Sequence, residues 1–161
     1  MKMKIAGIIP ESIVDGEGLR FVIFVQGCHH HCPGCHNPET WDFNNGIEMS
    51  TQEIEARFLS NKLIKGITLS GGEPFGQPLA CSVLAKTAKD HGLTVWCYTG
   101  YVYETLISLN DPQVNDLLAY IDVLVDGPYK KELRDLSLDW RGSSNQRVIR
   151  LKLKKKRIKR S

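Results

Sequence analysis

The chain has 161 residues, of which 42% are hydrophobic, and this size suits one compact domain with its own core. No apolar run reaches the roughly 18 residues of a membrane span, and Pro10, Glu11 and Asp15 follow the start too soon for a secretory signal, so we expect a cytoplasmic protein without membrane contact. Three of the five cysteines lie within eight residues, which in a reducing compartment indicates metal ligands or catalytic thiols rather than disulfides.

The charge divides the chain into two regions. Seven basic residues and no acidic residue follow Leu151, and removing these seven from the net charge of +3 leaves −4 for residues 1–151. The sequence therefore predicts a single domain over residues 1–151 and a basic C-terminal tail over residues 152–161. We interpret the tail as a solvated end that at most touches a partner. A nucleic-acid partner would depend on the tail alone and is not expected.

Apolar segments along the chain predict a series of strands. The run Phe21–Val25 is β-branched and aromatic throughout, as is typical of a strand buried on both faces. Other apolar segments of strand length occupy residues 5–9, 67–69, 93–97, 121–125 and 147–151.

Helix signals lie between these segments. Ser50 and Glu53 form a capping-box pattern, which predicts a helix of about ten residues after Ser50. Pro78 is suited to the first turn of a second helix, which should end near His91 and Gly92. Residues 103–109 and 113–120 give one or two further helices.

Alternating strands and helices predict an α/β fold made of parallel βαβ units. The chain is too short for a closed eight-stranded barrel, which needs at least about 200 residues, so we expect an open, partial parallel β/α barrel or an open parallel sheet. Ligands bind at the carboxyl ends of the strands in such folds. Glycine-rich and polar segments follow four of the predicted strands, at residues 27–28, 70–73, 98–100 and 126–128.

Cys28, Cys32 and Cys35 follow the strand at residues 21–25 in the spacing Cys-x3-Cys-x2-Cys. Thiolates are soft ligands that suit iron–sulfur clusters and zinc. Three cysteines can hold three irons of a [4Fe–4S] cluster and leave the fourth iron open for another ligand. A Cys3His zinc site is the alternative, and within this loop alone it is equally well supported. Four histidines in the loop are candidates for its fourth ligand: His29, His30, His31 and His36.

The wider sequence favours the iron–sulfur interpretation. A structural zinc site predicts nothing about Gly71-Gly72-Glu73 at the end of the next main strand. The cysteine spacing together with this motif resembles the radical S-adenosylmethionine enzymes. Residues 12–20 and 35–42 resemble the glycyl-radical activating enzymes within that superfamily. The short length and residues 141–147 resemble most closely the activating proteins of anaerobic (class III) ribonucleotide reductases, and the resemblance covers residues 4–150.

The resemblance implies a chemistry and two cofactors. A reduced [4Fe–4S] cluster on Cys28, Cys32 and Cys35 would pass one electron to S-adenosylmethionine. The resulting 5′-deoxyadenosyl radical would take a hydrogen atom from a glycine of the partner, an anaerobic ribonucleoside-triphosphate reductase. A low-potential donor such as flavodoxin would supply the electron. Three alternatives remain: the activating enzyme of pyruvate formate-lyase or another glycyl-radical enzyme, a radical enzyme acting on a small molecule, and a zinc-binding interaction module.

The resemblance also implies which residues bind S-adenosylmethionine. Gly34 stands before the third cysteine, where many radical enzymes have an aromatic residue, so His36 or Asn37 is expected to contact the adenine instead. Asp126 ends a buried strand and needs a polar partner there. The expected cofactor-binding residues are His36, Asn37, Gly71, Gly72, Glu73, Thr99, Asp126 and Asn145.

Overall fold

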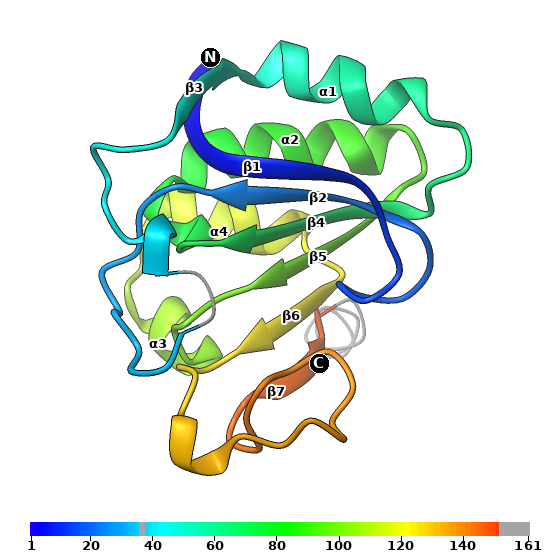
Figure 1. The fold of residues 1–161 in the computed structure, drawn as a ribbon. Helices are drawn as coiled ribbons and strands as arrows, with labels where there is room; N and C mark the ends of the chain where they lie inside the picture. Colours follow the sequence, from blue (N-terminus) through cyan, green and yellow to red (C-terminus); the bar gives the residue numbers. More distant parts are fainter. Residues whose placement is uncertain (36–37, 152–161) are drawn as a thin grey trace, which may run out of the picture.

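A seven-stranded sheet forms the centre of the protein, and its strands follow the order β3-β1-β2-β4-β5-β6-β7 (Figure 1). The computed structural model describes residues 1–35 and 38–151, so His36, Asn37 and the basic tail at 152–161 lie outside the described residues. The strands are β1 (Lys2–Ser12), β2 (Arg20–Val25), β3 (Ile47–Ser50), β4 (Gly66–Gly71), β5 (Thr94–Tyr98), β6 (Val123–Asp126) and β7 (Arg147–Arg150).

Strands β2, β4, β5 and β6 are parallel and form the middle of the sheet. Three further strands extend the sheet, and each pairs in antiparallel orientation with its neighbour: β1 with β2, β3 with β1, and β7 with β6. The predicted open α/β domain is thus confirmed, with antiparallel strands added at both edges. The reason lies in the connections, because a parallel pair needs a long crossover whereas a short loop reverses the chain. Only residues 13–19 separate β1 from β2. Residues 127–146 between β6 and β7 are long enough for a crossover, but they contain no α-helix and instead lead back to an antiparallel pair.

The predicted helices are all present as α1 (Thr51–Ser60), α2 (Pro78–Asp90), α3 (Tyr103–Ser108) and α4 (Pro112–Tyr120). Ser50 caps α1 by accepting a hydrogen bond from the Glu53 amide at 3.1 Å, as the capping box predicts. After α2, Gly92 has φ of +77°, a conformation that favours glycine. Short 3-10 helices at Pro38–Thr40, Pro74–Gly76 and Lys131–Leu133, like β3, carry no clear sequence signal. Within residues 1–35 and 38–151, no helix is long and apolar enough to cross a membrane.

The two faces of the sheet are covered differently. Helices α1, α2 and α4 pack side by side on one face, which holds the main core (Figure 1). Because side chains alternate along a strand, Val95 and Cys97 of β5 point into this core while Trp96 points to the other face. There Trp96 packs with Val123 and Val125, and Trp140 from the segment after β6 covers the cluster. The segment 127–146 therefore covers this cluster, on the face of the sheet against which none of the described α-helices packs.

The side chain of Arg20 joins three parallel strands on this second face. It is 1% exposed. Its Nε donates to Thr68 Oγ1 at 2.8 Å, and its two terminal nitrogens donate to oxygens of Glu17, Ile67 and Thr94 at 2.7–3.0 Å. Burial lowers the pKa of Arg20 to about 10, so the guanidinium stays charged at neutral pH. The residue is therefore a structural tie between the amino ends of β2, β4 and β5.

Replacing Arg20 should destabilise the fold strongly. Arg20→Met keeps much of the volume but removes the donors to buried oxygens, so we expect the free energy of unfolding to fall by about 2–4 kcal/mol in urea denaturation. Arg57→Met, on an exposed part of α1, is the matched control and should change stability by less than about 0.5 kcal/mol. Equal stabilities of the two variants would contradict this role of Arg20.

Candidate active site

A cavity of about 210 Å³ opens at the carboxyl ends of the parallel strands. Its wall contains Cys28, Cys32 and Cys35 from the loop after β2, which lie together as the sequence predicts. The turns after β4 and β5 add Gly71, Gly72 and Thr99. Three further polar residues of the wall come from the segment after β6: Tyr129, Arg141 and Gln146, of which the last two lie in the stretch 141–147 that carries the family resemblance.

Backbone hydrogen bonds hold the cysteine loop against the 3-10 helix at Pro38–Thr40 and the residues after it. The amide of Gly27 donates to the Thr40 carbonyl at 2.6 Å, and the amide of Cys28 donates to the Trp41 carbonyl at 3.1 Å. The amide of Cys35 donates to the carbonyl of Cys32 at 3.0 Å, which makes the segment between them a turn. The loop thus has a fixed base and presents its three thiols from one side.

The three thiols form no disulfide, are partly exposed and open to the same cavity. Burial raises the pKa of the Cys28 and Cys32 thiols, so metal binding must displace their protons. Among the described residues, no three His, Cys, Asp or Glu side chains converge on a position for a single metal ion. A cubane cluster makes a different demand, because its cysteine ligands bind separate irons. The three partly exposed thiols on one cavity wall fit such a cluster.

Gly71 and Gly72 are required by the approach of β4 to β2. A side chain at Gly71, where φ is +85°, would place its Cβ 2.7 Å from the Phe24 backbone, and one at Gly72 would meet the carbonyl of Gly27. The amide of Gly72 instead donates to the Val25 carbonyl at 2.8 Å. The two glycines therefore bring the turn after β4 directly beside the base of the cysteine loop, and both stay on the cavity wall.

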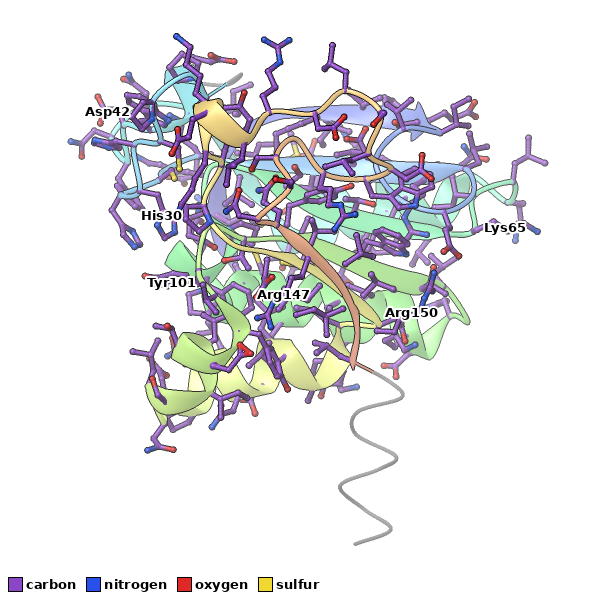
Figure 2. All side chains as sticks on the ribbon, turned by 90° about the horizontal axis from the view of Figure 1, so that it is seen from below. His30, Asp42, Lys65, Tyr101, Arg147 and Arg150 are labelled. Carbon is purple, nitrogen blue, oxygen red and sulfur yellow. The ribbon has the colours of Figure 1, made fainter. Side chains whose placement is uncertain are left out.

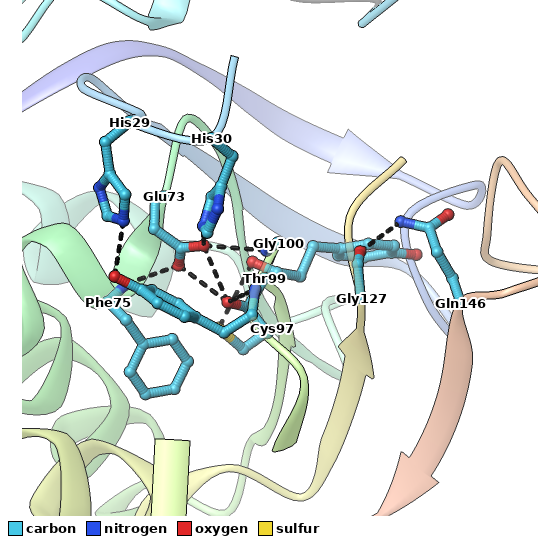
Figure 3. A network of polar contacts seen from close by, with 11 residues as sticks. His29, His30, Glu73, Phe75, Cys97, Thr99, Gly100, Gly127 and Gln146 are labelled. Carbon is cyan, nitrogen blue, oxygen red and sulfur yellow. Dashed lines mark hydrogen bonds and ion pairs between the residues drawn. The ribbon is translucent and has the colours of Figure 1, made fainter. Parts of the chain in front are cut away.

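The carboxylate of Glu73 is completely buried and joins three segments (Figure 3). One oxygen lies 2.7 Å from His30 Nε2 and accepts hydrogen bonds at 2.8 Å from the Thr99 hydroxyl and the Gly100 amide. The other accepts from the Phe75 amide at 2.9 Å. Glu73 thus lies behind the cavity wall and holds together the cysteine loop and the ends of β4 and β5, rather than facing the cavity itself.

The described histidines of the cysteine loop have protein partners. His29 Nε2 lies 2.6 Å from the Tyr101 hydroxyl, and His30 contacts Glu73. The His31 ring stacks on Trp41 with ring centres 4.6 Å apart. The geometry therefore gives these three imidazoles structural contacts, whereas His36 lies outside the described residues.

Two further predicted residues also have protein partners. Asp126 is 1% exposed and accepts hydrogen bonds from Arg147 at 2.5 and 3.0 Å and from the Tyr103 amide at 2.8 Å. Asn145 donates to the Pro128 carbonyl at 2.8 Å, while its buried Oδ1 has no partner among the described residues. Asp126 therefore has the polar partner that its burial requires, and its role in cofactor binding stays a prediction.

Gln146 and Arg141 organise the wall contributed by residues 127–146. Gln146 accepts hydrogen bonds from the amides of Gly142 and Ser143 at 2.9 and 3.1 Å and donates to the Gly127 carbonyl at 3.0 Å (Figure 3). Arg141 donates to the Gln146 carbonyl at 2.9 Å, but its buried Nε has no partner within the described part of the chain. This segment lacks helical or strand periodicity, so the resemblance of residues 141–147 to the activating proteins is the sequence signal that points to it.

The three thiols on one cavity wall fit an iron–sulfur protein of the single-cluster type, and a comparison with known protein families agrees. The family described as "4Fe-4S single cluster domain" matches residues 14–149. The crystal structure of QueE from Escherichia coli aligns with 62% of this chain and 53% of its own at 18% identity, with a TM-score of 0.48.

Curated relatives identify the family more narrowly. Proteins named anaerobic ribonucleoside-triphosphate reductase-activating protein from Salmonella typhimurium and Escherichia coli are each 41% identical over 152 residues, which cover 89% of this chain and 96% of the relative. The protein of that name from Enterobacteria phage T4 is 39% identical over 147 residues, covering 88% and 90%. This chain therefore belongs to the family of anaerobic ribonucleoside-triphosphate reductase-activating proteins.

The network around Glu73 makes a testable prediction. Glu73→Gln places an amide NH2 among groups that themselves donate hydrogen bonds, so we expect the free energy of unfolding to fall by about 1–3 kcal/mol. The cysteine loop should also exchange its amide hydrogens faster, because one of the two oxygens that hold the three segments together becomes an amide nitrogen. The exposed Glu132→Gln is the control. Hydrogen exchange in the loop that is equal in both variants would argue against a positioning role for Glu73.

Proposed function

We propose that this chain activates an anaerobic ribonucleoside-triphosphate reductase by forming a radical on one of its glycines. The observation that carries the proposal is that three thiols outside any disulfide share one cavity with Gly71 and Gly72 in a member of this family. The reductase is then a protein substrate, and S-adenosylmethionine and a [4Fe–4S] cluster are the cofactors.

Cys28, Cys32 and Cys35 are the ligands of the cluster in this proposal. When bound, the reduced cluster supplies the electron that cleaves S-adenosylmethionine and so allows a hydrogen atom to be taken from the glycine of the reductase. The chain's own contribution is placement. The fixed base of the cysteine loop sets the position of the thiols relative to the ends of β4 and β5.

The remaining wall residues hold S-adenosylmethionine. Arg141 is the only Lys or Arg among the described wall residues, and its Nε is buried without a partner. We assign this guanidinium to the carboxylate of the methionine part, because a charge-assisted hydrogen bond satisfies both groups. Gly71, Gly72 and Thr99 line the same space. Glu73 acts as a positioning residue behind them.

The proposal also covers the electron donor and the cellular location. A low-potential protein such as flavodoxin is the proposed electron donor, and the cytoplasm the proposed location, because the reaction consumes reducing equivalents. All described wall residues fall between Cys28 and Gln146. We therefore propose that residues 1–151 form the active domain and that the basic tail at 152–161 takes no part in cofactor cleavage.

The cluster assignment predicts a specific loss in one cysteine variant. Cys32→Ala removes one ligand, so protein reconstituted without oxygen should hold well below the expected value of about four irons per chain and should not cleave S-adenosylmethionine. Cys81→Ala, at a buried cysteine in the main core, is the matched control and should retain both properties. Full iron content and cleavage in Cys32→Ala would refute the assignment.

The assignment of Arg141 predicts a loss of cofactor affinity. Arg141→Met keeps an unbranched side chain but removes the charge, so the dissociation constant for S-adenosylmethionine should rise by about tenfold or more, measured by equilibrium dialysis on the reconstituted protein. The iron content should not change. Arg134→Met, in the same segment but outside the cavity wall, serves as the control. An unchanged dissociation constant in Arg141→Met would remove Arg141 from the cofactor site.

A further inference from the structure

Three consecutive histidines, His29, His30 and His31, lie between the first two cysteines of the loop. We call them the histidine run. A zinc site would use one of these imidazoles as a metal ligand, but in the structure each of them contacts a different part of the protein. The proposed function gives the histidine run no part in the chemistry. The contacts of its three rings, directly beside Cys28, show what it does instead.

The first anchor of the run is Tyr101, in the turn after β5. Its hydroxyl lies 2.6 Å from His29 Nε2, and the centres of the two rings are 5.4 Å apart. The same ring stands nearly perpendicular to the His30 ring with centres 4.7 Å apart, and Figure 2 shows the two residues side by side. The backbone of Tyr101 is itself held, because its amide donates to the Thr99 hydroxyl at 3.1 Å and its carbonyl accepts from the Gly127 amide at 2.8 Å. Tyr101 therefore gives the cysteine loop a fixed partner.

His30 and His31 are anchored in two other directions. His30 Nε2 lies 2.7 Å from the buried carboxyl group of Glu73 (Figure 3). Gly100 makes room for this contact, because a Cβ there would lie 2.5 Å from the His30 ring. His31 stacks on Trp41, and its backbone has φ of +47°, a conformation that is uncommon outside glycine. The anchors thus hold the backbone of the run as well as its rings.

The held backbone directs two amides at one sulfur. The amides of His30 and His31 both donate hydrogen bonds to the Cys28 thiol. Burial raises the pKa of this thiol, whereas the two hydrogen bonds act in the opposite direction. Hydrogen bonds of this kind stabilise negative charge on a sulfur, so they favour the thiolate that a metal requires. The contacts of the histidine run therefore converge on the Cys28 sulfur.

We propose that the histidine run, held by its three anchors, positions the amides of His30 and His31 on the Cys28 sulfur and so sets the reduction potential of the cluster. The inference rests on the proposed function, in which Cys28 binds one iron. An electron from the donor makes the cluster more negative, so hydrogen bonds to a ligand sulfur stabilise the reduced form more than the oxidised form. The two amides therefore make the potential less negative, and the histidines are positioning residues that act through the backbone.

Tyr101→Phe tests the proposal, because it keeps the ring and removes only the hydroxyl that holds His29. The full chain, reconstituted with its cluster, is poised without oxygen at the midpoint potential of the unchanged protein. We expect the ratio of reduced to oxidised cluster to be lower by about threefold or more in the variant. Tyr120→Phe, at a partly buried tyrosine of α4, is the matched control and should leave the ratio unchanged. An unchanged ratio in Tyr101→Phe, at full iron content, would overturn the proposal.

A double-mutant cycle identifies the contact that acts. His29→Phe keeps a flat ring but removes the nitrogen that meets the Tyr101 hydroxyl. If this contact carries the effect, His29→Phe and Tyr101→Phe should lower the ratio by similar factors, and the double variant should be no worse than either. Effects that multiply in the double variant would show that the two residues act separately, contrary to the proposal.

Hydrogen exchange of the cluster-free chain gives a readout that does not depend on iron. Loss of the anchor in Tyr101→Phe should speed the exchange of the His30 and His31 amides by about tenfold, whereas Tyr120→Phe should not. Equal exchange in the two variants would contradict the anchoring. The iron content of the unchanged chain reports separately on the proposed function, since a chain that binds no four-iron cluster would refute the cluster assignment whatever the exchange rates are.

Discussion

The buried carboxylate of Glu73 is the constraint on which the arrangement of the active site depends. It is fully enclosed, and it has no Lys or Arg partner among the described residues, so its charge is balanced only by the donors that surround it. These donors come from the cysteine loop, the turn after β4 and the turn after β5. Because an unsatisfied buried carboxyl group is costly, the three segments must stay together so that the Glu73 side chain keeps its hydrogen bonds.

The sheet extends this constraint to the whole cavity. The parallel register aligns the carboxyl ends of β2, β4, β5 and β6, which brings the cysteine loop beside the glycine turns. At the amino ends of the strands, Arg20 connects β2, β4 and β5 through hydrogen bonds to neutral oxygens. The same parallel alignment thus places the three thiols at the carboxyl ends of the strands and the buried charge of Arg20 at their amino ends.

The sequence predicted the parts of the structure that depend on local or periodic signals. The capping box at Ser50, the helix start at Pro78 and the buried run at Phe21–Val25 all lie where the pattern places them, and the three cysteines share one cavity. The directions of β1 and β7 were not predictable from alternation, because that of β1 depends on the short connection to β2 and that of β7 on the path of residues 127–146, which form no crossover helix. The partners of Glu73 and Asp126 were not predictable either. Both acids were expected to face the cofactor, but their contacts join residues more than 20 positions apart, for which spacing gives no signal.

Formation of a glycyl radical is the most direct test of the central claim. The reduced, cluster-loaded chain would be mixed without oxygen with S-adenosylmethionine and the anaerobic ribonucleoside-triphosphate reductase, and electron spin resonance would be recorded. The account predicts a glycine-centred radical on the reductase that requires S-adenosylmethionine and is absent with the Cys32→Ala variant. A reductase that stays free of radical, while the same preparation cleaves S-adenosylmethionine, would contradict it.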